Sequence, residues 1–319
     1  MIVILGPTAT GKTKVAVQVA QRVDGEIISA DSRQVFRGMN IGTGKDLSEY
    51  VVEGAHTPFH LIDVAEPGEE YSVFRFQQDF LKAWNDIQKR GKTAILCGGT
   101  GFYIESVLKQ YRLDPVPENP ELRKYLKTKT DEQLTAILAS MRKLHNKTDI
   151  EERSRLIRTI EIDTFYLQHP DSVSKFQNID YQAFGITYER NIICQRITKR
   201  LEQRLKEGMI EEVENLLQQG ISPQRLCSYG LEYRFITQYI QGELGYEEML
   251  SQLNIAIRQF AKRQMTWFRK MEREGINIHW INSDTSAEEK AEMIVNALAI
   301  KSPSIFGKTK SHLYRYFLL

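Results

Sequence analysis

The strongest constraint on the fold lies at the start of the chain, where a glycine-rich loop separates an apolar run from a helical pattern. Residues 2–5 (IVIL) are all apolar, as in a buried strand, and Val15, Val19 and Val23 recur at helical spacing. Between them, residues 6–13 read GPTATGKT and match GxxxxGK[ST] in full. A strand, this loop and a helix in succession predict a phosphate-binding loop at the edge of a parallel sheet.

The predicted loop has the chemistry to hold an anion. Its glycines let successive N–H groups point inward, and the helix that follows adds the partial positive charge of its N-terminus. We expect Lys12 to reach terminal phosphate oxygens and Thr13 to ligate Mg²⁺. The motif leaves open whether the loop holds a diphosphate or a nucleoside triphosphate. The predicted phosphate-binding residues are Gly6, Pro7, Thr8, Ala9, Thr10, Gly11, Lys12 and Thr13.

The rest of the sequence predicts an α/β fold, with a P-loop NTPase-like parallel sheet core and a helical insertion domain. Apolar runs at residues 26–29, 59–64 and 93–97 alternate with helical patterns, which is typical of a parallel sheet covered on both faces. Prolines 115, 117 and 120 mark a boundary. We expect residues 1–113 and about 181–300 to form the core with a helical C-terminal part, about 114–180 to form the helical insertion, and 301–319 to be a tail.

Composition and charge exclude a membrane protein and a general polycation. Apolar residues make up 41% of the chain, and no run approaches the roughly 20 apolar residues of a membrane span. The net charge is only +2. The three cysteines, Cys97, Cys194 and Cys227, form no CxxC pair, and no signal peptide precedes the first predicted strand. We therefore expect a cytoplasmic protein with neither a disulfide framework nor a zinc site.

Two aspartates follow predicted strands and are candidates for chemistry beside the loop. Ligands of open α/β sheets bind at the carboxyl ends of the strands, where Asp31 is expected. Asp31 can be a metal ligand or a general base, and the alternative is a turn aspartate. Asp63, in HLID, resembles a Walker B aspartate, and a turn residue is an equal alternative.

A second glycine loop, residues 98–101 (GGTG), ends the predicted strand at 93–97. Consecutive glycines let a substrate approach the backbone closely, whereas the alternative is a plain strand-to-helix turn. No acid ends this strand, which weakens an ATPase interpretation.

Basic residues are spaced along helix faces in three places. Such stripes can follow a phosphate backbone, and aromatic residues among them can stack on unpaired bases. The alternative is a solvated face with i,i+4 partners such as Glu202 and Glu207. Three stripes together with a phosphate-binding loop favour an anionic macromolecule as partner. The stripes are Arg155 and Arg158; Arg196, Arg200 and Arg204; and Arg258, Lys262, Arg269 and Arg273, with Phe260, Trp267 and Phe268 among the last.

In combination, these motifs resemble the tRNA dimethylallyltransferases, also called tRNA isopentenyltransferases. The resemblance runs from Met1 to about Ile281. No CxxC or His pair follows this region, and in this respect the chain is similar to bacterial-type members. DSRQV and AKRQ-TWFR in one chain make the resemblance specific. The motifs are, in order, GPTATGKT, DSRQVFRGMNIGTGK (31–45), HLID (60–63), GGTGFY (98–103), RLIRTIE (155–161) and RQFAKRQMTWFR (258–269).

The resemblance implies a reaction and its partners. Family members transfer the dimethylallyl group of dimethylallyl diphosphate to N6 of the adenosine on the 3′ side of the anticodon (tRNA position 37). The tRNAs that they modify read codons starting with U. For this chain the resemblance implies Mg²⁺ as cofactor, with the tRNA anticodon stem-loop and dimethylallyl diphosphate as partners. We also expect a monomer that does not associate with a membrane.

The resemblance also implies roles for individual residues. Asp31, Thr100 and Arg200 are the implied catalytic residues, with Asp31 as general base and Arg200 neutralising the diphosphate. Thr13 is the implied Mg²⁺ ligand. The implied tRNA-binding residues are Asp31, Ser32, Arg33, Gln34, Thr100, Arg123, Ser154, Arg155, Leu156, Ile157, Arg158, Lys262, Arg263, Gln264, Trp267 and Arg269.

The sequence departs from the family pattern in places, and other functions stay open. Glu232 stands where a basic residue is usual, and residues 147–151 differ from the usual run before the arginine motif. These departures affect expected tRNA contacts and leave Lys12, Thr13 and Asp31 untouched. A small-molecule kinase and a nucleotide-gated RNA-binding module are the alternatives.

Overall fold

The computed structural model describes residues 1–111, 113–141, 153–169, 177–282 and 284–301. The chain divides into two compact units, Met1–Lys109 with Asn178–Leu319, and Gln110–Gln177, which are described separately below. Of the expected tail, 302–319 lies outside the described residues, as do 147–151. Within the described ranges, no helix combines the length and apolarity needed to cross a membrane.

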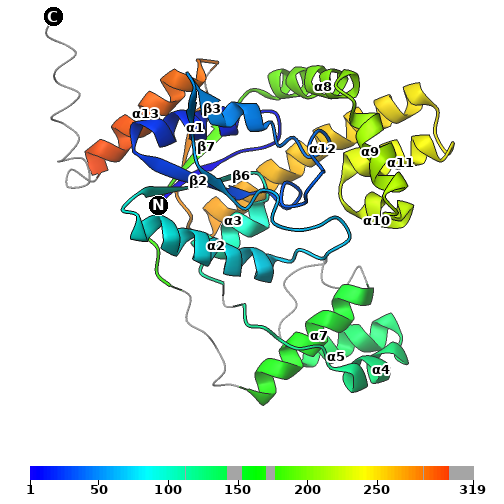
Figure 1. Ribbon diagram of the computed structural model, residues 1–319. Coiled ribbons are helices and arrows are strands. Elements are labelled where there is room, and N and C mark those ends of the chain that lie inside the picture. The colour runs from blue at the N-terminus through cyan, green and yellow to red at the C-terminus, as the bar shows by residue number, and fades with distance from the viewer. Residues whose placement is uncertain (112, 142–152, 170–176, 283, 302–319) are drawn as a thin grey trace, which may run out of the picture. The chain divides into compact units, whose positions relative to one another are not determined.

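A six-stranded parallel sheet forms the centre of the larger unit, which confirms the predicted fold class (Figure 1). The first strand is central, and its last residue, Leu5, pairs with Gly98 on one side and Gly185 on the other. The carboxyl ends of three strands therefore meet at one edge. In sheet order the strands are β5 (Phe59–His60), β2 (Gly25–Ala30), β6 (Thr93–Gly98), β1 (Ile2–Leu5), β7 (Gln182–Thr187) and β8 (Ile278–Asn282).

One strand is shorter than the sequence suggested. The expected strand at 59–64 ends at His60, because Leu61 (φ 62°) and Asp63 (φ 56°) adopt left-handed conformations that no strand accommodates. A separate two-stranded hairpin, β3 (Val51–Val52) with β4 (Ala55–His56), follows the short 3₁₀ helix η1 (Leu47–Tyr50).

Helices cover both faces of the sheet (Figure 1). On one face, Val15 and Val19 of α1 pack with Ala291 and Ile294 of α13 and with sheet residues in one apolar core. On the other face lie α2 and α3. The bounds of these helices are Lys12–Arg22 (α1), Val73–Lys89 (α2), Gly101–Leu108 (α3) and Ala287–Lys301 (α13).

Five further helices of the same unit enclose a second core. Val35, Phe36 and Met39, from the segment after β2, are buried in this core against Tyr233 and Leu253. The segment that begins at Asp31 is thereby anchored to the helices. Gly208 (φ 98°) adopts a left-handed conformation and separates the first two helices. The helices are α8 (Arg190–Lys206), α9 (Met209–Gln218), α10 (Pro223–Ser228), α11 (Leu231–Ile240) and α12 (Tyr246–Arg273).

The smaller unit contains three described helices around a small apolar core. They are α4 (Pro120–Lys127), capped by Asn119, α5 (Asp131–Met141) and α7 (Arg153–Gln168). Leu156 and Ile157 of α7 lie in this core with Leu126, Leu134 and Leu138. The expectation that the side chains of Leu156 and Ile157 contact tRNA is therefore wrong, because packing within the unit occupies them.

Candidate active site

The GPTATGKT loop lies at the carboxyl end of the central strand. Gly6 approaches β7 so closely that a Cβ there would overlap the carbonyl oxygen of Ile186. Gly11 (φ 75°) precedes the first turn of α1, and the Thr10 hydroxyl donates to the carbonyl of Pro7 at 2.9 Å. The loop is thus braced internally, and the helix N-terminus follows it directly, as an anion site requires.

Lys12 begins α1 and lies among charged groups of the site. Its Nζ is 3.4 Å from the carbonyl oxygen of Pro7. Burial lowers the pKa of Lys12, and the positive charge of Arg200 lowers this pKa further, whereas Asp31 raises it. These influences place Arg200 and Asp31 in the electrostatic environment of Lys12, and an arriving anion would relieve the cost of its buried charge.

The arginine stripe on α8 faces this loop. Arg196 donates from Nε to the carbonyl of Ala9 at 2.7 Å, and Arg200 Nη1 lies 3.4 Å from Thr8 Oγ1. Burial lowers the pKa of Arg200 to about 10, and neighbouring Arg204 contributes. Desolvated positive charge beside the loop strengthens an anion site.

The acid partner of this stripe comes from outside its own helix. Arg204 is buried and donates to Asp46 Oδ2 at 3.1 Å, and Arg200 lies 3.8 Å from the same oxygen. Glu207 accepts from Gln203 instead. A solvated face with i,i+4 acids is therefore the wrong interpretation of Arg204.

Asp31 and Thr100 come together from two adjacent strand ends. Asp31 Oδ1 accepts hydrogen bonds from the backbone N–H of Arg33 (2.8 Å) and Gln34 (3.3 Å), which is the turn role considered for it. Its other oxygen, Oδ2, receives no hydrogen bond from any described residue, so turn formation leaves it available. Thr100 Oγ1 accepts from the N–H of Ser32 at 3.0 Å. One carboxylate oxygen and one hydroxyl are thus fixed close to the phosphate-binding loop.

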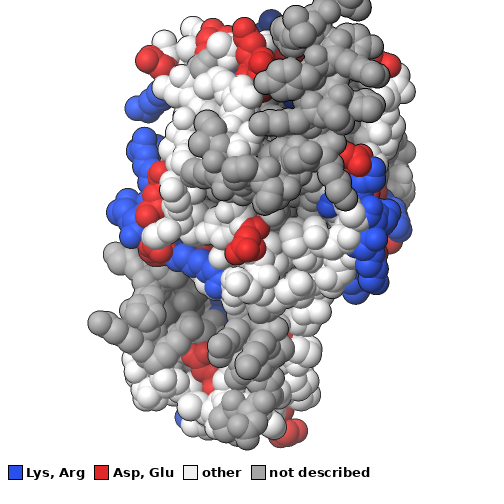
Figure 2. Space-filling view, turned by 90° about the vertical axis from the view of Figure 1, so that its left-hand side faces the viewer, with Lys and Arg blue, Asp and Glu red and all other residues white. Residues whose placement is uncertain are grey.

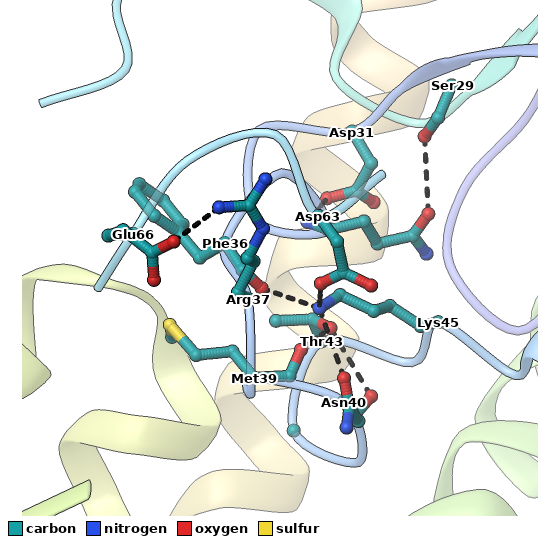
Figure 3. A network of polar contacts seen from close by, with 12 residues as sticks. Ser29, Asp31, Phe36, Arg37, Met39, Asn40, Thr43, Lys45, Asp63 and Glu66 are labelled. Carbon is teal, nitrogen blue, oxygen red and sulfur yellow. Dashed lines mark hydrogen bonds and ion pairs between the residues drawn. The ribbon is translucent and has the colours of Figure 1, made fainter. Parts of the chain in front are cut away.

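Asp63 has a structural partner in this chain (Figure 3). Its carboxylate pairs with the Lys45 ammonium, whose side chain is 1% exposed. The same Nζ donates to the Phe36 carbonyl at 2.5 Å and to Asn40 Oδ1 at 3.1 Å. Asp63 therefore acts as the counterion of a buried lysine, and its interpretation as a Walker B metal ligand is wrong. No local pattern in the sequence marks Lys45 as the partner of Asp63.

Glu232, the departure noted on α11, lies in the site. Together with Thr8, Arg200 and Arg204 it lines a cavity of about 20 Å³, room for a single water. Burial raises the pKa of Glu232, while Arg204 and Arg200 lower it. Glu232 is recognisable in the sequence as a departure from the family pattern. No local pattern, however, predicts that it lies beside Arg200 and Arg204.

Helix α12 has one exposed basic face and one buried face. The exposed residues include five of its predicted basic residues, whose contacts with RNA stay predictions. Phe268 is fully buried and unavailable for stacking, and Gln264 is 8% exposed. Gln264 is therefore wrongly predicted as a tRNA contact, because its amide bonds Thr8 and Gly99. The exposed basic residues are Arg258, Lys262, Arg263, Arg269 and Arg273.

Positive charge is local on the surface. In the view of Figure 2, Lys and Arg side chains form separate groups with Asp and Glu between them. This distribution agrees with a net charge of only +2. A partner attracted by these groups is held at specific places on the surface.

In the smaller unit, two predicted RNA-binding arginines balance a buried acid. Arg123 donates to Glu161 from Nε (3.0 Å) and Nη2 (2.8 Å), and Arg158 pairs with the same carboxylate. Burial raises the pKa of Glu161, but hydrogen bonds from Arg123, Asn119 and Arg158 outweigh burial, and the pKa is lowered. RNA contacts by Arg123 and Arg158 stay predictions, as do those by Ser154 and Arg155, which are exposed on α7.

Among the described residues, the candidate metal ligand is a single hydroxyl group. None of their clusters of His, Cys, Asp and Glu is suited to hold a metal ion. Thr13, in the first turn of α1, supplies one hydroxyl beside the phosphate-binding loop. Such a donor fits Mg²⁺, which prefers one or two protein ligands and takes the rest from phosphate oxygens and water.

Comparison with known proteins agrees with this site. A family model described as IPP transferase matches residues 34–271, and one described as isopentenyl transferase matches residues 1–57. A tRNA dimethylallyltransferase 1 of Parabacteroides distasonis is 54% identical over 91% of this chain and 94% of its own. A tRNA dimethylallyltransferase 2 of Phocaeicola vulgatus is 52% identical over 95% and 98%.

A solved structure extends the similarity to three dimensions. The full-length tRNA isopentenylpyrophosphate transferase from Bacillus halodurans is 32% identical to this chain, with a TM-score of 0.69. The match covers 98% of this chain and 99% of the other. The similarity therefore includes both units and the phosphate-binding loop.

Proposed function

This chain belongs to the tRNA dimethylallyltransferase family, the IPP transferases, and we propose that its P-loop site transfers a dimethylallyl group from dimethylallyl diphosphate to N6 of adenosine 37. Its tRNA substrates are those that read codons starting with U. One observation carries this assignment: the braced loop with Lys12 and Arg200 lies in the same site as the open carboxylate oxygen of Asp31. An anion holder and a base in one site fit alkyl transfer from a diphosphate.

The loop and its cations bind and stabilise the leaving group. Breaking the bond between the allylic carbon and oxygen places negative charge on diphosphate. Backbone N–H groups of residues 9–13, together with Lys12 and Arg200, would receive this charge in a partly desolvated site. Mg²⁺ held by Thr13 would supply further positive charge to the diphosphate oxygens.

Asp31 is the general base of this proposal. As the new bond forms between the adenine N6 and the allylic carbon, the amine must lose a proton, which passes to Asp31 Oδ2. General base catalysis of this kind contributes about 10²–10⁴ in rate. Thr100, whose Oγ1 accepts a hydrogen bond from the N–H of Ser32 at 3.0 Å, would orient the same amine.

The RNA partner is the anticodon stem-loop. The exposed basic residues of α12 can follow its phosphates, and Phe102, 40% exposed and in contact with Trp267, offers a surface for stacking. The reacting adenine must leave its stack at a cost of a few kcal/mol to reach the site. We expect the enzyme to act in the cytoplasm, where its tRNA substrate is found. We also expect it to act as a monomer.

The test uses labelled dimethylallyl diphosphate, Mg²⁺ and unmodified tRNA, followed by mapping of the label. We expect label on adenosine 37, and a loss of at least about 100-fold in rate for D31N. D86N is the matched control, since Asp86 is exposed on α2 and pairs with exposed Lys89. Label at another base, or a D31N rate equal to that of D86N, would refute the proposal.

A further inference from the structure

The buried face of α12 carries one polar residue in an apolar series. Its buried positions include Ile257, Ala261, Phe268 and Met271, and Gln264 lies on the same face. Burying an amide costs free energy unless its groups are hydrogen-bonded. The buried amide of Gln264 therefore needs hydrogen-bond partners to offset this cost.

Gln264 finds both partners in the active site. Its Oε1 accepts from the backbone N–H of Thr8 at 2.8 Å, and its Nε2 donates to the carbonyl of Gly99 at 2.8 Å. The orientation of the amide is fixed by these partners, because the N–H can only donate and the carbonyl can only accept. One side chain thus joins the phosphate-binding loop to the second glycine loop.

The second loop is held tightly on both sides of Thr100. A Cβ at Gly99 would lie 2.6 Å from Gln264 Nε2, and one at Gly101 would overlap the Trp267 ring. Both contacts come from α12. Thr100, between these glycines, contacts the Asp31 segment through Ser32. A continuous chain of contacts therefore runs from Thr8 through Gln264 and Gly99 to Thr100 and the segment of the proposed base.

We propose that Gln264 is a positioning residue that sets the diphosphate-binding loop against Thr100 and Asp31, and that it makes no contact with RNA. The inference rests on the proposed function, since it assigns a role within that site. In a transfer reaction the donor is held by one loop and the acceptor amine by another. Misplacement by about 1 Å can cost about 10²-fold in rate, so the amide that links the loops controls the chemical step.

Two substitutions separate this role from RNA binding. Q264M keeps the length of the side chain and removes both hydrogen bonds. We expect its kcat to fall about 10- to 100-fold, while its Kd for an anticodon stem-loop stays within about twofold of wild type. Q259M is the matched control, because Gln259 is exposed on the same helix. A weaker Kd with unchanged kcat at saturating RNA would overturn the proposal, as would unchanged values of both.

Q264E supplies a readout that general loss of stability would not produce. A protonated carboxyl can still accept from Thr8 N–H and donate to the Gly99 carbonyl, whereas an ionised carboxylate would face that carbonyl with negative charge. The ratio of the Q264E rate to the wild-type rate should therefore rise as pH falls, because pH effects common to both enzymes cancel in the ratio. A ratio independent of pH would overturn the proposal. If Q264M fails to fold, the pH dependence of Q264E still tests the positioning role of Gln264. A wild-type enzyme without transfer activity would instead refute the proposed function.

Discussion

Lys45 and Asp63 form an ion pair across 18 residues of sequence and thereby fasten the segment that carries Asp31. The Lys45 side chain is buried, and its ammonium also bonds the Phe36 carbonyl and Asn40 within that segment. We expect D63N to destabilise the protein by about 3 kcal/mol, because it leaves a buried ammonium without its counterion. Urea unfolding measures this change in the free energy of unfolding.

K45M is the informative partner of that variant. It removes the buried charge itself and leaves Asp63, 35% exposed, in contact with water, so its cost should be smaller than that of D63N. An unchanged free energy of unfolding in D63N, combined with a weaker dependence on Mg²⁺, would contradict the structural role of Asp63 and restore its interpretation as a metal ligand.

Arg200 should show opposing effects on stability and function. Its pKa of about 10 is below the ordinary value, so burial of its charge costs stability at every pH below 10, and the cost is relieved as pH rises through that value. We expect R200M to stabilise the ligand-free protein by about 1 kcal/mol, allowing for solvent screening of a one-third exposed side chain. Thermal unfolding measures this gain, and a lower melting temperature for R200M would contradict it.

Diphosphate binding should depend on the same titration. Because the charged form of Arg200 binds the anion, the affinity of the wild-type protein for inorganic diphosphate should fall as pH rises through about 10. Titration calorimetry from pH 8 to about 10.5 follows this loss. In R200M the affinity should be at least about tenfold weaker at pH 8, and an unchanged affinity would remove Arg200 from the site.

The smaller unit should become less stable in acid because of Glu161. The folded-state pKa of this carboxyl is lowered, so its stabilising contribution is complete above the unfolded value and is lost as pH falls through the folded one. The protection of the α7 amides from hydrogen exchange should therefore decrease below about pH 4 in the wild type. In E161Q the protection should be lower at neutral pH and should change less with acid. Identical pH profiles would argue against this ion-pair cluster.

The exposed face of α12 should govern RNA affinity without affecting the donor. We expect the double variant K262E/R263E to weaken anticodon stem-loop binding and to reduce the slope of log K against log salt by at least about 1. Its affinity for diphosphate should not change. K89E, at an exposed position at the end of α2, is the control. Equal salt slopes for the two variants would place the RNA elsewhere.

Local signals in the sequence were enough to predict the phosphate-binding loop, the parallel sheet and the position of Asp31. They failed where a partner came from a distant segment. Nothing near HLID shows that Asp63 meets Lys45, and nothing near Arg204 shows that its acid is Asp46. Gln264 is different, since its spacing from Ile257, Ala261 and Phe268 places it on an apolar face. The apolar spacing around Gln264 is therefore visible in the sequence. The basic residues next to it, however, favoured the prediction that Gln264 contacts RNA.

A structure of the enzyme with diphosphate and an anticodon stem-loop tests the central claim most directly. The quantity to measure is the distance from Asp31 Oδ2 to the exocyclic amine of adenosine 37, with diphosphate in the loop of residues 6–13. The account predicts a hydrogen bond of about 2.6–3.2 Å. An amine beyond the reach of this carboxylate, or a diphosphate bound away from Lys12, would contradict it.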